Sequence, residues 1–502
     1  MKQFAWLILF FPLAAFAQTT SFEERSTTAS NMRLNVTNLG TFGNAFRGYR
    51  DGTGESSCEY PAGSGIEHLY EGGFWIGGLE NGANIRVSTA AVDNNGGYSP
   101  GTSGFEFTAD PGSGLRERST LQDNPNFSLD AVSHQDYFAT FTDRNLLIPG
   151  TSIPIAQHTN PMDVEVTVET FNWNYTFSDF MVIVQFTVEN TGANFYDDLY
   201  IALYNNTVVR NINVTPAGSG GVAFYDKGGN GYMDSIHTAY CFDALGDPGF
   251  TDSYIGQKFL GAEDKYGFHH PYVDSSFNSV TGQMEADTAF KVNFNGWQWN
   301  SSNATYAAPA SDNQRYLKMS DGLNDNPCWI NPANPLCAGT DIQADFNAPG
   351  NRSDLVSAGP FRRFEPGDVI TITYAYVIGP KNDDGNPNTA NTEAQRANLK
   401  RNANWAQTAY NGEDVNFNGL LDDGEDVDGN GEITRFILPS PPDIPRTHIE
   451  AGENFIDVYW SNNAEKSVDP ITRLGDFEGY RVYLSRLGFD VTGTPNLAED
   501  FV

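Results

Sequence analysis

The chain has 502 residues, and 29 Lys and Arg against 63 Asp and Glu give it a formal charge of −34. Only 18% of residues are charged and 39% are hydrophobic, so the acidity reflects scarce basic residues in a chain of globular composition. A polyanion without a basic stripe repels nucleic-acid phosphates and anionic lipid heads, which argues against both as partners. Divalent cations remain suitable binding partners, because carboxylates and side-chain amides are the oxygen ligands that calcium prefers.

The first 17 residues predict a cleaved secretory signal peptide. Met1-Lys2 is a short basic start, an apolar run follows, and Ala15-Phe16-Ala17 fits the small-x-small rule for cleavage. The run is shorter than the roughly 20 residues of a membrane-spanning helix, and no later segment is apolar enough to span a bilayer. We therefore expect a secreted or cell-surface, extracellular protein with no membrane span.

Residues 18–155, rich in Gly and Asn, and residues 156–390 both show the pattern of β-structure. Short apolar-alternating runs are separated by Gly, Asn, Asp and Pro clusters. Val164, Val166 and Val168 share one face of a half-buried strand. The same alternation predicts strands over 180–188, 199–203 and 369–378. This spacing predicts a mainly β protein with antiparallel β-sandwich domains, because a parallel α/β sheet needs intervening helices.

Export would place the four cysteines in an oxidising space. Cys328 and Cys337 bracket a Pro- and Asn-rich loop and predict a local disulfide, which leaves Cys58 and Cys241 as the remaining pair. A zinc site is the alternative, but no Cys-x-x-Cys pair and no neighbouring His supports it.

One helix is predicted, over residues 391–410. Thr392 and Gln395 form a capping box at its start. Four residues share its apolar face: Leu399, Ala403, Ala406 and Tyr410. We expect this face to pack against the β-structure rather than to recognise a partner.

Residues 411–437 contain two tandem loops with the ligand spacing of an EF-hand. In the first, residues 414–425, the oxygen ligands at positions 1, 3, 5, 7, 9 and 12 are Asp414, Asn416, Asn418, the Leu420 carbonyl, Asp422 and Glu425. Gly419 stands at position 6, where the loop must turn sharply. Partial matches arise by chance in a chain rich in Asp, Asn and Gly, but a match ending in Glu is much rarer. The first loop therefore predicts bound calcium.

The second loop follows at once and is less complete. Its candidate ligands are Asp426, Asp428, Asn430, Glu432 and Thr434. Its twelfth residue, Ile437, cannot coordinate, so the site is incomplete unless an acid of the first loop completes it. Pro439 and the residues after it prevent a full exiting helix. The pair resembles the tandem calcium repeats of thrombospondin type 3 and dockerin-like segments, which implies a structural role for the ion.

Residues 438–447 have the composition of a stiff Pro-rich linker. Beyond it, Phe455–Trp460 and Gly479–Leu484 predict two strands. The first carries Trp460 where a fibronectin type III domain has its core Trp, and the second resembles that family's Gly-Tyr-x-Val-Tyr strand. A sandwich of this class needs roughly 100 residues. We therefore expect residues 448–502 to be a truncated fibronectin type III-like module.

No catalytic motif stands out. The sequence lacks His-Glu-x-x-His, a Gly-x-Ser-x-Gly elbow and a phosphate-binding loop. His269-His270, with Asp264 and Asp274 nearby, could ligate a metal, but adjacent strand residues point to opposite faces. The aromatic runs at 171–173 and 297–299 suit either sugar-stacking platforms or core packing.

The chain as a whole resembles modular surface proteins secreted by the type IX system of Gram-negative bacteria. The features that carry this resemblance are the signal peptide, the Gly- and Asn-rich β regions, the tandem loops and the strand near 476–481. Our leading hypothesis is a calcium-stabilised surface or adhesion protein without catalytic activity, whose unidentified surface ligand is a glycan or a protein. The alternative is a secreted hydrolase, or a carbohydrate-binding accessory protein, acting on polysaccharide or protein. Whether the chain is an enzyme stays open, with the balance towards no.

Overall fold

A computed structural model of the chain forms two compact units. The first comprises residues up to 410 together with 416–420, and the second comprises 411–415 and the residues from 421 onward. The predicted signal peptide lies outside the described residues, as do Pro439 and Pro441 of the predicted linker. The structure describes residues 22–92, 104–109, 112–215, 225–247, 249–273, 275–286, 289–299, 301, 303–438, 442, 445–469, 474–475 and 477–482.

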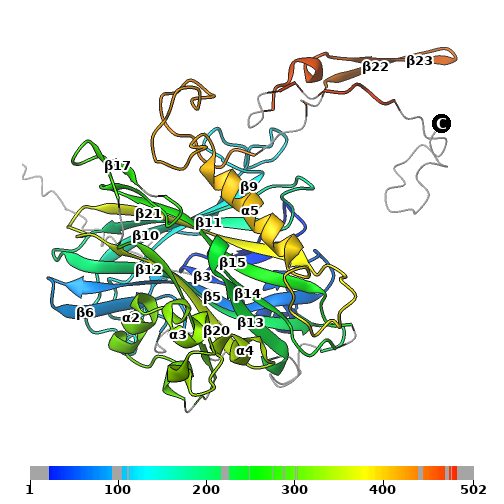
Figure 1. Ribbon diagram of the computed structural model, residues 1–502. Helices are drawn as coiled ribbons and strands as arrows, with labels where there is room; N and C mark the ends of the chain where they lie inside the picture. The colour runs from blue at the N-terminus through cyan, green and yellow to red at the C-terminus, as the bar shows by residue number, and fades with distance from the viewer. Residues whose placement is uncertain are drawn as a thin grey trace, which may run out of the picture. The chain divides into compact units, whose positions relative to one another are not determined.

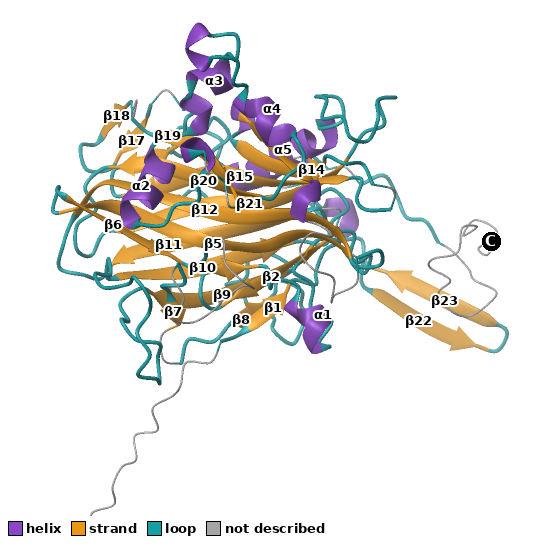
Figure 2. Ribbon diagram, turned by 90° about the horizontal axis from the view of Figure 1, so that it is seen from below, coloured by secondary structure: helices purple, strands orange, loops and turns teal. Residues whose placement is uncertain are grey.

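The first unit is built on two large antiparallel β-sheets (Figures 1 and 2). The nine-stranded sheet contains β1 (Glu24–Ser26), β2 (Arg33–Thr37), β3 (Thr41–Phe42), β4 (Cys58–Glu59), β5 (Ile66–Glu80), β6 (Asn84–Thr89), β12 (Tyr196–Asn211), β19 (Lys291–Gln298) and β20 (Arg352–Phe361). The ten-stranded sheet contains β7 (Thr108–Ala109), β8 (Arg116–Arg118), β9 (Gln135–Thr142), β10 (Val164–Asn172), β11 (Met181–Asn190), β13 (Gly228–Met233), β14 (Thr238–Asp243), β15 (Ser253–Asp264), β16 (Gly267–His269) and β21 (Val369–Pro380). The predicted mainly β, antiparallel architecture is confirmed.

The alternating patterns correspond to β10, β11, β12 and β21. Val164, Val166 and Val168 are all fully buried, and Val166 pairs with Val188 across β10 and β11. Strands of the two predicted β regions combine in the same sheets, since β12 pairs with β5 in one and β10 pairs with β9 in the other. The sheets therefore form between segments that are distant in the sequence.

The main hydrophobic core lies between the two sheets. Phe74 of β5 meets Phe186 of β11 with ring centroids 4.8 Å apart. The next residue, Trp75, points to the other face of the nine-stranded sheet, as strand alternation requires. There it stacks with Tyr204 and Trp297 in a second buried cluster. Helix α2 (Asp312–Ser320) covers this cluster.

Helix α5 (Ala397–Asn411) covers β15 and β21 on the outer face of the ten-stranded sheet (Figure 1). The helix lies close because β15 has glycines beneath it: a Cβ on Gly261 would lie 2.6 Å from the Tyr410 ring. The predicted apolar face is buried as expected. The helix starts later than predicted, because the Thr392–Gln395 capping box closes a turn over 393–396 ahead of it.

Short elements complete the first unit. They are α1 (Arg47–Asp51), α3 (Pro327–Ile330), α4 (Ile342–Asn347) and a small hairpin of β17 (Ser276–Asn278) and β18 (Gln283–Glu285). Among the described residues, no helix is both long and apolar enough to cross a membrane.

The cysteine prediction is half right. Cys328 and Cys337 form a disulfide beside α3, as predicted. Cys58 and Cys241 do not pair and are both buried as free thiols. Cys58 lies on β4 of one sheet and Cys241 on β14 of the other. Packed sheets lie about 10 Å apart, whereas the Cα atoms of a disulfide lie about 4–7 Å apart.

Among its described residues, the second unit contains one hairpin, of β22 (Thr447–Gly452) and β23 (Phe455–Trp460). The predicted strand over 455–460 is confirmed. Residues 479–482 form no strand, and 483–484 lie outside the described part. A strand needs a neighbour for its backbone hydrogen bonds, and no described strand pairs with this segment. Trp460 is 42% exposed and contacts the Tyr480 ring at 5.5 Å, so no sandwich core surrounds it within the described residues.

Candidate metal centre

Three carboxylates of the second unit come together at the second loop. Ligand oxygens of Glu413, Asp426 and Asp428 all lie within 4.8 Å of one another. Asp426 and Asp428 occupy positions 1 and 3 of the predicted loop, whereas Glu413 precedes the first loop and was not predicted as a ligand. The structure therefore supplies the acid that the second loop lacks at its twelfth position.

The hydrogen bonds of Glu413 explain how it reaches the second loop. Its buried carboxylate accepts from the backbone N–H of Val427 at 2.6 Å and of Thr434 at 2.9 Å, which are positions 2 and 9 of that loop. It also accepts from the N–H of Asp428 at 3.2 Å. Hydrogen bonds that backbone N–H groups donate to an ionised carboxylate are among the stronger hydrogen bonds in proteins. Glu413 is thus fixed in place by the loop that it completes.

Glu425 makes the equivalent bonds to the first loop. Its carboxylate accepts from the N–H of Val415 at 3.0 Å and of Asp422 at 2.9 Å, again positions 2 and 9. Glu413 and Glu425 are 12 residues apart, the length of one loop. Glu413 and Glu425 therefore make equivalent hydrogen bonds in two copies of one repeat. Each carboxylate accepts from the backbone N–H groups at positions 2 and 9 of one loop.

The two loops also share the same internal hydrogen bond and the same glycine conformation. The N–H of Leu420 donates to Asn418 Oδ1 at 2.8 Å, and the N–H of Glu432 donates to Asn430 Oδ1 at 2.6 Å. Gly419 and Gly431, both at position 6, have φ of 76° and 79°. A left-handed backbone there favours glycine, which is why the motif requires it.

The predicted ligands of the first loop are divided between the two units. Residues 416–420 belong to the first unit, where Phe417 packs against Phe268 and His270 with ring centroids 4.8 and 5.0 Å away. Residues 414–415 and 421–425 belong to the second unit. There, Asp414 Oδ2 is buried and lies 3.7 Å from Arg435. The ligand set of the first loop remains a prediction from its sequence.

Other predicted calcium ligands of the second loop are joined by hydrogen bonds. The hydroxyl of Thr434 donates to Asp428 Oδ2 at 2.8 Å and accepts from the Asn430 amide at 3.0 Å. No bond from the Glu432 carboxylate into the cluster is seen in the described part of the chain. The donors that do converge are carboxylate oxygens, which suit a hard cation such as calcium better than a thiophilic metal.

Phe417 lies against a cluster of buried basic side chains that includes His270, His237 and Lys258. His270 contacts His237 with ring centroids 5.6 Å apart, and Lys258 donates to the Ile236 carbonyl at 2.7 Å. Burial lowers the pKa of Lys258 to about 7 and that of His237 to about 3, and it also lowers the pKa of His270 well below the ordinary value of a histidine. The neighbouring His269 instead pairs with Asp264 at 2.8 Å, so the two adjacent histidines serve different environments, as predicted from strand alternation.

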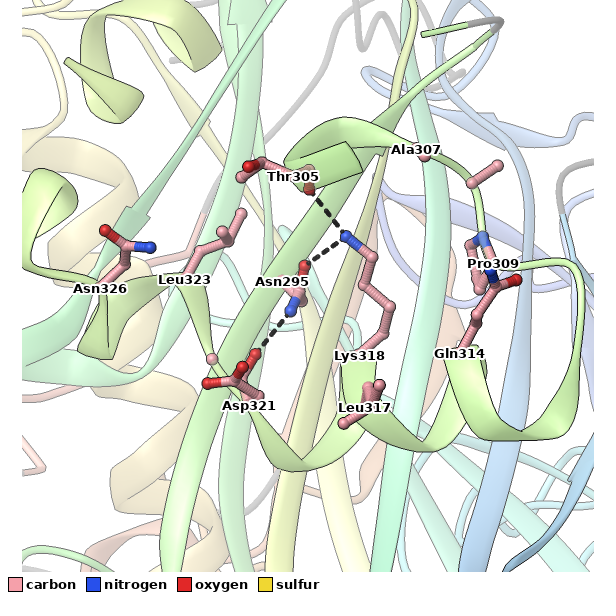
Figure 3. Close-up of a pocket in the computed structure, with 12 residues that line it drawn as sticks. Asn295, Thr305, Ala307, Pro309, Gln314, Leu317, Lys318, Asp321, Leu323 and Asn326 are labelled. Atoms are coloured by element: carbon pink, nitrogen blue, oxygen red, sulfur yellow. Dashed lines mark hydrogen bonds between the residues drawn. The ribbon is translucent and has the colours of Figure 1, made fainter. Parts of the chain in front are cut away.

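A pocket of about 310 Å³ lies beside α2, between that helix and β19 (Figure 3). Lys318 reaches into it and donates to the Thr305 carbonyl at 2.9 Å and to Asn295 Oδ1 at 3.2 Å. Burial lowers the pKa of Lys318 to about 8. Asp321 is the one carboxylate in the lining. Glycoside hydrolysis usually needs two carboxylates about 5–10 Å apart, and this pocket does not provide them.

Comparisons with known proteins give no family. No protein-family model matches the chain, and no curated protein matches it. Among solved structures, the chain is similar to a putative aldose 1-epimerase from Escherichia coli K12, at 7% sequence identity and a TM-score of 0.26, over 72% of this chain and 100% of that one. A likeness this weak carries neither the fold nor the activity of that protein to this chain.

Proposed function

We propose that this chain is an exported, calcium-stabilised β-rich protein of the cell surface or extracellular space, with a role in adhesion or surface structure rather than catalysis. The observation that carries the proposal is the meeting of Glu413, Asp426 and Asp428 within 4.8 Å. Like charges this close repel one another, and a divalent cation between them would turn that repulsion into attraction.

In the second loop, Glu413, Asp426 and Asp428 would hold the ion, with Asn430 as a further oxygen donor. In the first loop, the sequence assigns Asp414, Asn416, Asn418, the Leu420 carbonyl, Asp422 and Glu425. The ion would neutralise the crowded acids and stiffen residues 411–437. Such a structural role suits loops that follow α5 directly and have no exiting helix.

The main alternative is a secreted hydrolase, and the pocket beside α2 offers it little support because it has a single carboxylate.

Isothermal titration of the secreted chain with calcium, and separately with magnesium, tests the proposal. We expect two calcium ions per chain, one for each loop, and much weaker binding of magnesium, which accepts irregular oxygen sites reluctantly. Absence of calcium binding would overturn the proposal. Turnover of a polysaccharide or protein in a hydrolase panel would overturn its non-catalytic part.

A further inference from the structure

A lysine and an asparagine side chain meet in the pocket beside α2 (Figure 3). Lys318 Nζ, from the helix, lies 3.2 Å from Oδ1 of Asn295, on β19. Because the Asn295 Cγ atom is about 1.2 Å from that oxygen, the amine lies within about 4.4 Å of this carbon. A small rotation of the lysine side chain brings the two atoms to the roughly 3–3.5 Å from which a nucleophile attacks.

The Asn295 amide is held at both ends. Its oxygen accepts from the backbone N–H of Gly296 at 2.9 Å, and its Nδ2 donates to the backbone carbonyl of Asp321 at 2.8 Å. Asn295 is only 3% exposed. An N–H that points at a carbonyl oxygen stabilises the negative charge that forms there when a nucleophile adds to the carbon. The amide is therefore both fixed in place and polarised towards attack.

The Lys318 amine is also positioned beside the amide. It donates to the Thr305 carbonyl at 2.9 Å and to the Gly296 carbonyl at 3.4 Å. Because burial lowers the pKa of Lys318 to about 8, about half of the amine is unprotonated at pH 8. An unprotonated lysine amine in a partly desolvated site is a good nucleophile. The pocket thus holds a nucleophile and a carbonyl carbon together.

We propose that Lys318 and Asn295 join in an isopeptide bond, a covalent cross-link between α2 and β19. The Nζ–Cγ bond forms and the Cγ–Nδ2 bond breaks. The amine gives up one proton to Nδ2, which leaves as ammonia, so the reaction needs no oxidant, metal or other reactant. Asp321 supplies the one carboxylate in the pocket lining and is suited to carry that proton between the two nitrogens.

Proximity provides the driving force for a reaction that is very slow between free molecules. Holding two reacting groups in place is equivalent to a concentration of about 10⁵ M or more. The cross-link would fix α2 on the nine-stranded sheet, over the cluster of Trp75, Tyr204 and Trp297 that the helix covers. The reaction involves none of the candidate calcium ligands, so this proposal stands apart from the calcium proposal.

Peptide mapping of the reduced, secreted chain by mass spectrometry tests the bond. Trypsin should release residues 292–315 joined to residues 316–352, because a linked Lys318 is no longer a cleavage site. The mass should be that of the two peptides less one ammonia. Lys318→Arg keeps the charge without the amine and should abolish the branched peptide, whereas Asp321→Asn should lower its yield. Lys291→Arg, at an exposed lysine on the same strand, is the matched control and should leave the yield unchanged.

Three results would overturn the proposal. The first is recovery of residues 292–315 and of residues 316–318 as separate, unmodified peptides from the unaltered chain, a result that does not depend on the folding of any variant. The second is loss of ammonia from residues 292–315 alone, which would mean that Asn295 had cyclised onto the Gly296 nitrogen. The third is an unchanged branched peptide in Lys318→Arg. An unchanged yield in Asp321→Asn would overturn the role given to Asp321.

Discussion

Glu413→Gln is expected to weaken calcium binding at the second loop by roughly 10- to 100-fold, a loss typical when a group that shapes a metal site is removed. The substitution removes one of the three negative charges that meet there and the carboxylate bonded to Val427 and Thr434. Gln keeps the size of the side chain and one acceptor oxygen, so the loop should still fold. Calcium titration calorimetry measures the effect on affinity.

Asp423→Asn is the matched control for this substitution. Asp423 is an exposed acid of the first loop that occupies no ligand position, so its loss changes the net charge equally without removing a ligand. We expect little change in calcium affinity for this variant. Equal weakening by Asp423→Asn and Glu413→Gln would mean that general charge, and not the carboxylate cluster, attracts the ion.

Lys258→Met is expected to raise the free energy of unfolding at pH 7 by about 1–4 kcal/mol, the range of stabilisation seen when buried ion pairs are replaced by apolar residues of similar volume. Lys258 is 1% exposed, and its amine donates to the Ile236 carbonyl with no carboxylate paired to it in the described structure. His237, His270 and Tyr272 surround it and bring no negative charge near neutral pH.

The pH dependence identifies the cause. In the unfolded chain Lys258 is protonated below about pH 10.5, but in the folded chain only below about pH 7. Between these values the unfolded state binds more protons, so stability falls as pH is lowered from about 10 to 7. His237, with its pKa lowered to about 3, adds a second fall as pH drops below 6.5. Lys258→Met should abolish the first fall and leave the second.

Urea unfolding at pH 7 and pH 9.5 measures this difference. Lys291→Met is the control, because Lys291 is an exposed lysine paired with Asp325 on the surface. It should change stability by less than about 1 kcal/mol. If the Lys258→Met protein is no more stable than the unaltered protein at pH 7, the contacts of the buried amine offset the free-energy cost of its burial, and the prediction is wrong.

The strands could be predicted because their burial follows the simple period of two. Val164, Val166 and Val168 had to face one core, and they do. How the strands combine could not be predicted, since β5 and β12 pair across more than a hundred residues and no local pattern specifies that register. The error over Cys58 and Cys241 has the same origin: spacing indicates that cysteines are available, but only the sheet arrangement decides whether they meet.

Asp426 and Asp428 of the carboxylate cluster could be predicted from ligand spacing, but Glu413 could not, because it lies outside the loop to which it hydrogen-bonds. One signal was present: Glu413 and Glu425 stand 12 residues apart, each immediately before a loop. Treating the two loops as copies of one repeat would have assigned them equal roles.

Limited proteolysis of the secreted chain, with calcium and with EDTA, tests the central claim most directly. If calcium stiffens residues 411–437, chelation should open this segment to rapid cleavage, and added calcium should restore protection while magnesium does not. Glu413→Gln should be cleaved readily even in calcium. Cleavage of the segment at the same rate with calcium and with EDTA would contradict a structural calcium site.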